Sequence, residues 1–178
     1  MIDTATYGPW ALIAGGSEGV GAEFALLLAE AGLNLVLVAR TADALEQTAT
    51  ECRRRGGEIR TLQADLSEPG ASARIAAATR ELEIGLLILV AGANTHSHEF
   101  LDGDLAAFHR VIDLNVSTPL ALTHHYGQAM RSRRRGGIVV LGSLAGYLGS
   151  ARHTGSLPRG CGWNSASTAS TCSNWCWA

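Results

Sequence analysis

The stretch WALIAGGSEGVG, at residues 10–21, decides the fold of this protein. Its apolar run Ala11–Ala14 is typical of a buried strand, and the residues after the stretch have helical periodicity. Between the two lies the spacing Gly-xxx-Gly-x-Gly, made by Gly15, Gly19 and Gly21. The first glycine permits a tight turn, the second lets backbone approach a pyrophosphate, and the third allows close helix packing. The stretch predicts a dinucleotide-binding turn, with a glycine loop of purely structural role as the alternative.

Outward from this turn, short apolar runs alternate with longer amphipathic ones, which is the pattern of a parallel sheet covered by helices. We expect five strands, at Ala11–Ala14, Leu33–Ala39, Ile59–Ala64, Leu86–Val90 and Ile138–Leu141. The expected helices are Val20–Ala31, Ala42–Arg55, Ser67–Glu81 and a longer one from Asp104 to Arg133. The predicted fold class is therefore α/β, a Rossmann-like doubly wound parallel sheet that stops after its fifth strand.

Apolar side chains of the first expected helix share one face, which we expect to be buried: Val20, Phe24, Leu27, Leu28 and Ala31. Gly32 follows as the expected C-terminal cap. Arginine runs at 53–55 and 131–135 close two other expected helices, and each is followed by Gly-Gly. Cations offset the negative end of a helix dipole, and glycine supplies a left-handed cap. We interpret both runs as helix ends, with a phosphate-binding surface as the alternative.

The composition narrows the class of protein. The chain has 178 residues, 47% of them hydrophobic, and a net charge of −2, which suits one globular domain and argues against a general nucleic-acid binder. No apolar run reaches the roughly 18 to 20 residues of a membrane span. Four cysteines without paired spacing, and no signal-peptide pattern at residues 1–9, favour a cytoplasmic protein. The close histidine pairs at 96–98 and 124–125 lack a third ligand, so no metal site is expected.

The glycine spacing resembles that of the short-chain dehydrogenase/reductase family, and further motifs follow in the family's order over residues 8 to about 150. The resemblance implies an NAD(P)-dependent oxidoreductase that interconverts a carbonyl and an alcohol of a small molecule. It adds Ser17 and Val20 to the glycines as residues at the cofactor. Family members commonly pair through their helices, but oligomerisation stays an open question for this chain.

Two residues at expected strand ends bear on the cofactor. Arg40 stands where an acidic side chain would hold the ribose 2′-hydroxyl of NAD, and arginine instead accommodates the 2′-phosphate of NADP. The alternative for Arg40 is a solvated cation. Asp65 matches the aspartate that the family places near the adenine ring, and its alternative is a helix N-cap, a role open also to Ser67. We expect NADP rather than NAD.

Further matches follow the fourth and fifth strands. Ala91 and Gly92 match half of the family's Asn-Asn-Ala-Gly, although Val90 replaces an asparagine. By resemblance, Asn115 is a catalytic residue that holds a proton-relay water through its carbonyl. Pro119, four residues on, has no N–H to bind that carbonyl, so we expect it to be free, with an ordinary helix kink as the alternative.

Ser143 matches the family's catalytic serine, which hydrogen-bonds the reacting oxygen; a turn serine that caps the strand end is the alternative. The family's tyrosine and lysine would then fall at positions 156 and 160. Ser156 and Gly160 stand there, and all 14 basic residues of the chain are arginine, so no lysine is present anywhere.

Residues 160–178 carry no charged side chain but hold three of the four cysteines and three of the four tryptophans. We interpret this change as a frameshift between about 150 and 156, with a divergent short form as the alternative. The chain then divides into a cofactor-binding domain at 1–155 and an aberrant, disordered tail at 156–178. Two functions remain open: an impaired oxidoreductase, or a non-catalytic product that binds NADP weakly. The sequence does not identify the substrate.

Overall fold

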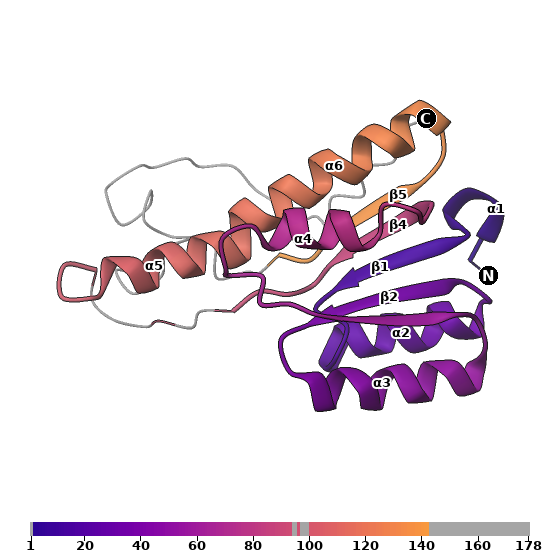
Figure 1. The fold of residues 1–178 in the computed structure, drawn as a ribbon, viewed down its shortest axis with the longest axis horizontal. Helices are drawn as coiled ribbons and strands as arrows, with labels where there is room; N and C mark the ends of the chain where they lie inside the picture. Colours follow the sequence, from indigo (N-terminus) through magenta and orange to yellow (C-terminus); the bar gives the residue numbers. More distant parts are fainter. Residues whose placement is uncertain (1, 94–95, 97–99, 143–178) are drawn as a thin grey trace, which may run out of the picture.

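A computed structural model of the chain describes residues 2–93, 96 and 100–142. Its strands form one parallel sheet in the order β3-β2-β1-β4-β5 (Figure 1). The strands are β1 (Trp10–Ala14), β2 (Asn34–Ala39), β3 (Ile59–Gln63), β4 (Ile84–Leu89) and β5 (Gly137–Val140). The other elements are α1 (Thr4–Tyr7), α2 (Gly19–Glu30), α3 (Ala42–Arg55), α4 (Ala71–Ala78), α5 (Leu105–Ile112), the π-helical η1 (Asp113–Ser117) and α6 (Thr118–Arg133). The predicted α/β class, a Rossmann-like doubly wound parallel sheet, is confirmed, and every expected strand is present within two residues of its expected bounds.

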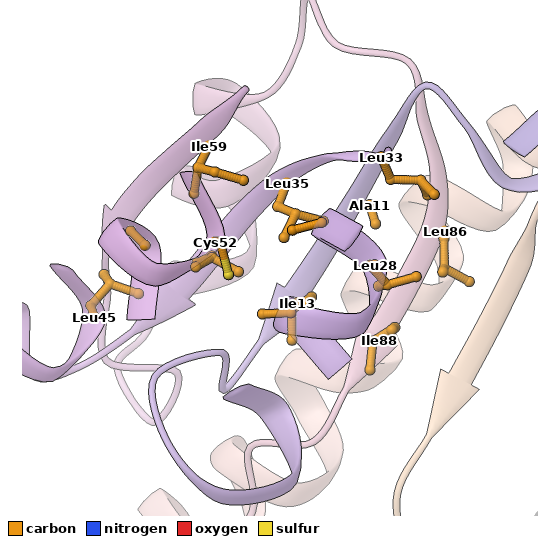
Figure 2. Packing of buried hydrophobic residues seen from close by; sticks show 14 of the residues in the cluster. Ala11, Ile13, Leu28, Leu33, Leu35, Leu45, Cys52, Ile59, Leu86 and Ile88 are labelled. Atoms are coloured by element: carbon orange, nitrogen blue, oxygen red, sulfur yellow. The ribbon is translucent and has the colours of Figure 1, made fainter. Parts of the chain in front are cut away.

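Helices cover both faces of the sheet, so β1 is buried along its whole length. Figure 1 places α2 and α3 on one face and α4 and α6 on the other. Figure 2 shows the first face, where Ile13 and Leu35 pack with side chains of α2 and α3. The sequence neighbours of these two residues, Leu12 and Val36, pack on the opposite face with α4 and α6. Successive side chains of a strand point to opposite faces, so a continuously apolar strand such as β1 contributes to both layers. The parallel pairing of the strands keeps their carboxyl ends in register.

The buried face of α2 differs from the expected one. Small residues dominate the true face: Gly21, Ala25, Leu28 and Ala29 are buried. Val20 and Leu27 are 52% and 57% exposed, so their expected burial was wrong. A Cβ atom on Gly21 would lie 1.9 Å from the carbonyl oxygen of Gly15, which shows how closely the helix approaches the turn. Close approach selects small side chains, whereas the sequence prediction gave most weight to large ones.

The long helix expected over Asp104–Arg133 is interrupted. The π-helical η1 separates α5 from α6, and the N–H of Thr118 donates to the carbonyl of Asp113, five residues earlier. Pro119 has no N–H to donate to the Asn115 carbonyl in the α-helical pattern, and this accounts for the change of helix type. The expected range is therefore helical from Leu105 to Arg133, but the helix type changes at the segment that carries Asn115.

Three helix ends also differ from expectation, one of them the end of α4, which lies at Ala78 rather than at Glu81. Helix α4 begins at Ala71 after Gly70, not at Ser67, because Pro69 disfavours helical backbone in the residue before it. At the end of α6 the left-handed residue is Arg134, with φ of 54°, rather than a glycine. Gly32, by contrast, has a φ of 86° after α2, as its expected capping role requires.

The arginines at the end of α6 bind backbone of other elements. The guanidinium of Arg133 donates to the carbonyl of Ile84 at 2.7 Å, and that of Arg135 donates to the carbonyl of Ala5 and pairs with Glu83. These contacts hold α6 against the start of β4 and against α1. The second arginine run therefore binds the backbone of β4 and of α1, in addition to ending α6.

Candidate functional site

The strand order creates a topological switch point at the carboxyl edge of the sheet, where open α/β sheets have their ligand-binding crevice. From β1 the chain passes to β2 and β3 on one side, then returns to β4 on the other side of β1. Connections leave the carboxyl ends of β1 and β4 in opposite directions, and open α/β sheets bind ligands at such a switch point. The loops 15–18 and 90–93 meet there: the N–H groups of Val90 and Ala91 both donate to the carbonyl of Ala14, at 3.0 and 2.8 Å.

Each glycine of the turn meets a separate steric demand. Gly15 has a φ of 98°, and a Cβ atom there would lie 2.6 Å from the nitrogen of Ala91. Gly21 faces the carbonyl of Gly15, so the turn and the first turn of α2 are in contact. Gly19 has a φ of 52°, and a Cβ atom there would meet no heavy atom within 4 Å. The backbone at Gly19 is therefore open to an approaching group, which is what a bound phosphate requires.

The residues beside the glycines differ in exposure. Ser17 is half-buried, and Val20 is exposed in the first turn of α2. Glu18 is the N-cap residue and makes no side-chain capping bond. The first N–H groups of a helix have no acceptor within the helix, and they carry the positive end of its dipole. The open backbone at Gly19 thus lies at an electropositive helix end.

Three hydrogen bonds fix this turn to neighbouring elements. The N–H groups of Gly15 and Gly16 donate to the carbonyl of Val38 in β2, at 2.8 and 3.2 Å. The hydroxyl of Thr48, on α3, donates to the carbonyl of Ser17 at 2.9 Å. The first half of the turn is therefore held by the sheet and the second half by α3.

Arg40 and Asp65 follow the neighbouring strands β2 and β3. Arg40 is exposed, and its carbonyl accepts a hydrogen bond from the side-chain amide of Gln63 at 3.1 Å. Asp65 accepts from the hydroxyl of Ser67 at 2.6 Å and from its N–H at 2.9 Å. These hydrogen bonds, together with the positive charge of Arg40, hold the pKa of Asp65 below its ordinary value. Asp65 caps a turn and not α4, so its alternative role as a helix N-cap was wrong.

Asn115 joins η1 to the loop after β4. Its side-chain nitrogen donates to the carbonyl of Ala93 at 3.0 Å and to that of Val111 at 2.8 Å. A Cβ atom on Gly92 would lie 2.9 Å from the Asn115 Oδ1 atom, so the glycine makes room for the amide. Residues 90–93, which form the β4 wall of the switch point, thus lie against the Asn115 side chain at Gly92 and Ala93.

The structure brings most of the predicted residues to one edge of the sheet. Contacts join Gly15 to Gly21 and Ala91, and Gly92 to Asn115. Arg40 and Asp65 lie at the same edge because β2 and β3 are parallel to β1. Ser143, the expected second catalytic residue, lies outside the described residues, as do the positions 156 and 160 and the expected tail at 156–178.

Sequence reasoning missed two threonines at this edge. Thr48 holds the glycine turn, and the buried hydroxyl of Thr118 donates to the carbonyl of Leu66 at 2.9 Å. Thr118 thereby links the start of α6 to the loop after β3. A signal existed for Thr48, which flanks the buried helix face formed by Leu45, Ala49 and Cys52. A polar side chain beside such a face needs a hydrogen-bond partner.

Known proteins share both this sequence and this fold. The model of the short chain dehydrogenase family matches residues 9–155. The chain belongs to the short-chain dehydrogenase family. Among curated relatives, the 7beta-hydroxysteroid dehydrogenase of Clostridium sardiniense is 35% identical over 142 residues, which is 79% of this chain and 54% of the relative. The very-long-chain 3-oxoacyl-CoA reductase of Podospora anserina is 35% identical over 147 residues, 79% of this chain and 43% of that protein.

Solved structures give the same result for the short-chain dehydrogenase fold. A 7beta-hydroxysteroid dehydrogenase superposes with a TM-score of 0.81 at 33% identity, covering 86% of this chain and 59% of that one. A short-chain dehydrogenase from Sphingobium yanoikuyae, solved with NADPH, gives 0.75 at 32% identity, covering 84% and 59%. The chain spans about half the length of the curated relatives it matches.

Three other observations concern features that the sequence analysis considered. The ring of His96 packs edge-on against Phe108, with ring centroids 4.8 Å apart. Across residues 2–93, 96 and 100–142, no three His, Cys, Asp or Glu side chains group as metal ligands would. In the same part of the chain, no helix has the length and apolarity needed to cross a membrane.

Proposed function

We propose that this chain binds NADP across the crevice between β1 and β4 and is an impaired oxidoreductase that interconverts a carbonyl and an alcohol. The observation that carries the proposal is the glycine turn: the open, positive-φ backbone at Gly19 lies at the electropositive end of α2. Such an arrangement binds the pyrophosphate of a dinucleotide. The family of the chain and the NADPH complex of a relative support the choice of a nicotinamide cofactor.

Different residues around the crevice would contact different parts of the cofactor. Backbone N–H groups from Glu18 to Val20 would bind the pyrophosphate, while Ser17 and Arg40 would bind the phosphorylated ribose. The exposed guanidinium of Arg40 has the charge and the planar fork that a 2′-phosphate requires, which favours NADP over NAD. Asp65 would lie beside the adenine, and Ala91 and Gly92 would leave room for the nicotinamide ribose. A bound nicotinamide supplies the hydride.

We propose that this chain is impaired in the step that transfers a proton to the substrate oxygen. Reduction of a carbonyl by hydride leaves a negative charge on oxygen, which an acid must neutralise. The family's tyrosine and lysine positions hold Ser156 and Gly160, and an alcohol is a far weaker acid than the tyrosine that it replaces. Asn115 and Ser143 remain as the proposed catalytic residues. We therefore expect cofactor binding with slow turnover.

The alternative is a non-catalytic protein that binds NADP weakly. One experiment separates the two functions: NADPH is titrated by its fluorescence, and oxidation of NADPH is then followed with a hydroxysteroid ketone and a 3-oxoacyl-CoA. Slow oxidation that depends on carbonyl substrate supports the impaired oxidoreductase. Binding without any oxidation supports the alternative, and absence of NADPH binding contradicts both.

A further inference from the structure

The hydrogen bond from Thr48 to the glycine turn crosses between two elements. Thr48 lies in the second turn of α3, 31 residues after Ser17, and its hydroxyl is 2.9 Å from the Ser17 carbonyl oxygen. The contact is partly buried, because Thr48 stands at the border of the helix face that carries Leu45 and Ala49. The acceptor is therefore part of the turn that would bind the cofactor, and the donor is not.

This bond fixes the orientation of one peptide group. In a trans peptide the carbonyl and the following N–H point in opposite directions. The carbonyl of Ser17 is directed to α3, so the N–H of Glu18 is directed to the other side of the turn. Glu18 is the N-cap of α2, and the N–H groups that begin there are the donors available to an anion.

The opposite orientation would oppose cofactor binding. Glycines on both sides of the 17–18 peptide give this turn unusual conformational freedom, since Gly15 and Gly19 both have positive φ. Rotation of the peptide would turn the partial negative charge of the Ser17 carbonyl away from α3 and remove the Glu18 N–H from the donor set. The bonds of Gly15 and Gly16 to Val38 do not prevent this rotation, because they hold the preceding peptides.

We propose that Thr48 is a positioning residue of the cofactor site, whose hydroxyl holds the peptide between Ser17 and Glu18 in the orientation that binds the cofactor phosphates. This inference rests on the proposed function, because it assigns the turn to a phosphate-bearing cofactor. Thr48 acts through Ser17 and does not itself touch the cofactor. Its role is therefore distinct from those of Arg40 and the glycines.

The test compares three variants of the full chain. Thr48→Val keeps the shape of the side chain and removes the donor, Thr48→Ser keeps the donor, and Thr50→Val makes the same change at an exposed position of α3. NADPH affinity is measured by fluorescence titration, and melting temperature is measured in parallel. Amide hydrogen exchange of the turn, residues 15–21, is measured in the free proteins.

Loss of one such hydrogen bond is expected to raise the Kd for NADPH about three- to tenfold in Thr48→Val. Exchange in the turn should accelerate in the same variant, while Thr48→Ser and Thr50→Val should match the unmodified protein in both measurements. A Thr48→Val protein that binds NADPH as the unmodified protein does overturns the inference and leaves the proposed function intact. Equal weakening in Thr48→Ser also overturns it. If the unmodified protein does not bind NADPH, the proposed function fails, and the positioning role fails with it.

Discussion

The side-chain nitrogen of Asn115 lies 3.0 Å from the carbonyl oxygen of Ala93, and this bond ties η1 to the loop that follows β4. The same nitrogen donates to Val111, one turn earlier in the helical segment. Gly92 allows the arrangement, since a side chain there would collide with the amide. The β4 wall of the site, residues 90–93, is therefore held by a residue that the family resemblance predicts to be catalytic.

Replacing Asn115 by alanine should loosen this wall. The change removes both donations and is expected to lower the free energy of unfolding by about 1–3 kcal/mol, because the acceptor carbonyls lose their partner. Amide exchange at residues 90–93 should accelerate, and affinity for NADPH should fall. Asn34→Ala is the matched control, since Asn34 also bonds to backbone through its side chain but lies at the opposite edge of the sheet. Equal effects of the two variants on exchange at 90–93 would refute a specific role of Asn115.

Gly21→Ala should be strongly destabilising. Its Cβ atom would lie 1.9 Å from the Gly15 carbonyl oxygen, so α2 must move away from the turn. Overpacking of this kind costs about 1–3 kcal/mol, measured by denaturant unfolding. Gly127→Ala, within α6, is the control: its Cβ atom would lie 3.6 Å from the Ile138 side chain, an ordinary contact. Alanine at 127 should stabilise the protein by about 0.5–1 kcal/mol, and a Gly21→Ala protein of unchanged stability would contradict the packing described.

Ser67→Ala should raise the pKa of Asp65. The Ser67 hydroxyl is the main cause that lowers this pKa from 3.8, so its removal should return the value toward 3.8. A lowered folded-state pKa stabilises the protein above the unfolded value, and this stabilisation is lost as pH falls through the folded value. Above about pH 4, Ser67→Ala should therefore lower the stability of the protein through this electrostatic effect. The effect should shrink in more acidic solution, where Asp65 becomes protonated. Carboxyl titration by NMR checks the pKa directly, and an unchanged Asp65 pKa would show that the hydroxyl is not its cause.

Much of the fold was predictable because its signals are local. Strand β1, the turn and the helix after it are marked by an apolar run and three glycines, and the contacts of Gly15 and Gly21 match the steric roles that the spacing indicates. The buried face of α2 was not predictable from hydrophobicity, because close packing against the turn selects Gly21 and Ala25 over Leu27. The π-helical segment depends on which carbonyls find donors around Pro119, which a periodicity pattern does not encode.

The candidate site was predictable where single residues carry a motif, and less so where the contacts are between distant elements. Asn115 and Gly92 were chosen separately, and only the fold shows that one makes room for the other. Thr48 and Thr118 carry no motif, and each acts on a carbonyl more than 30 residues away in sequence. The sequence does not indicate which backbone carbonyl accepts such a hydrogen bond, because every residue has a backbone carbonyl.

The central claim, that the crevice beside β1 binds NADP, is tested most directly by titrating NADPH and NADH into the unmodified chain, Arg40→Ala and Arg54→Ala. Arg54 has a 73% exposed side chain at the far end of α3 and serves as the control for loss of a surface charge. We predict that NADPH binds about tenfold or more tightly than NADH, and that Arg40→Ala removes this difference while Arg54→Ala retains it. Equal affinity for the two cofactors in the unmodified chain, or no binding of either, would contradict the account.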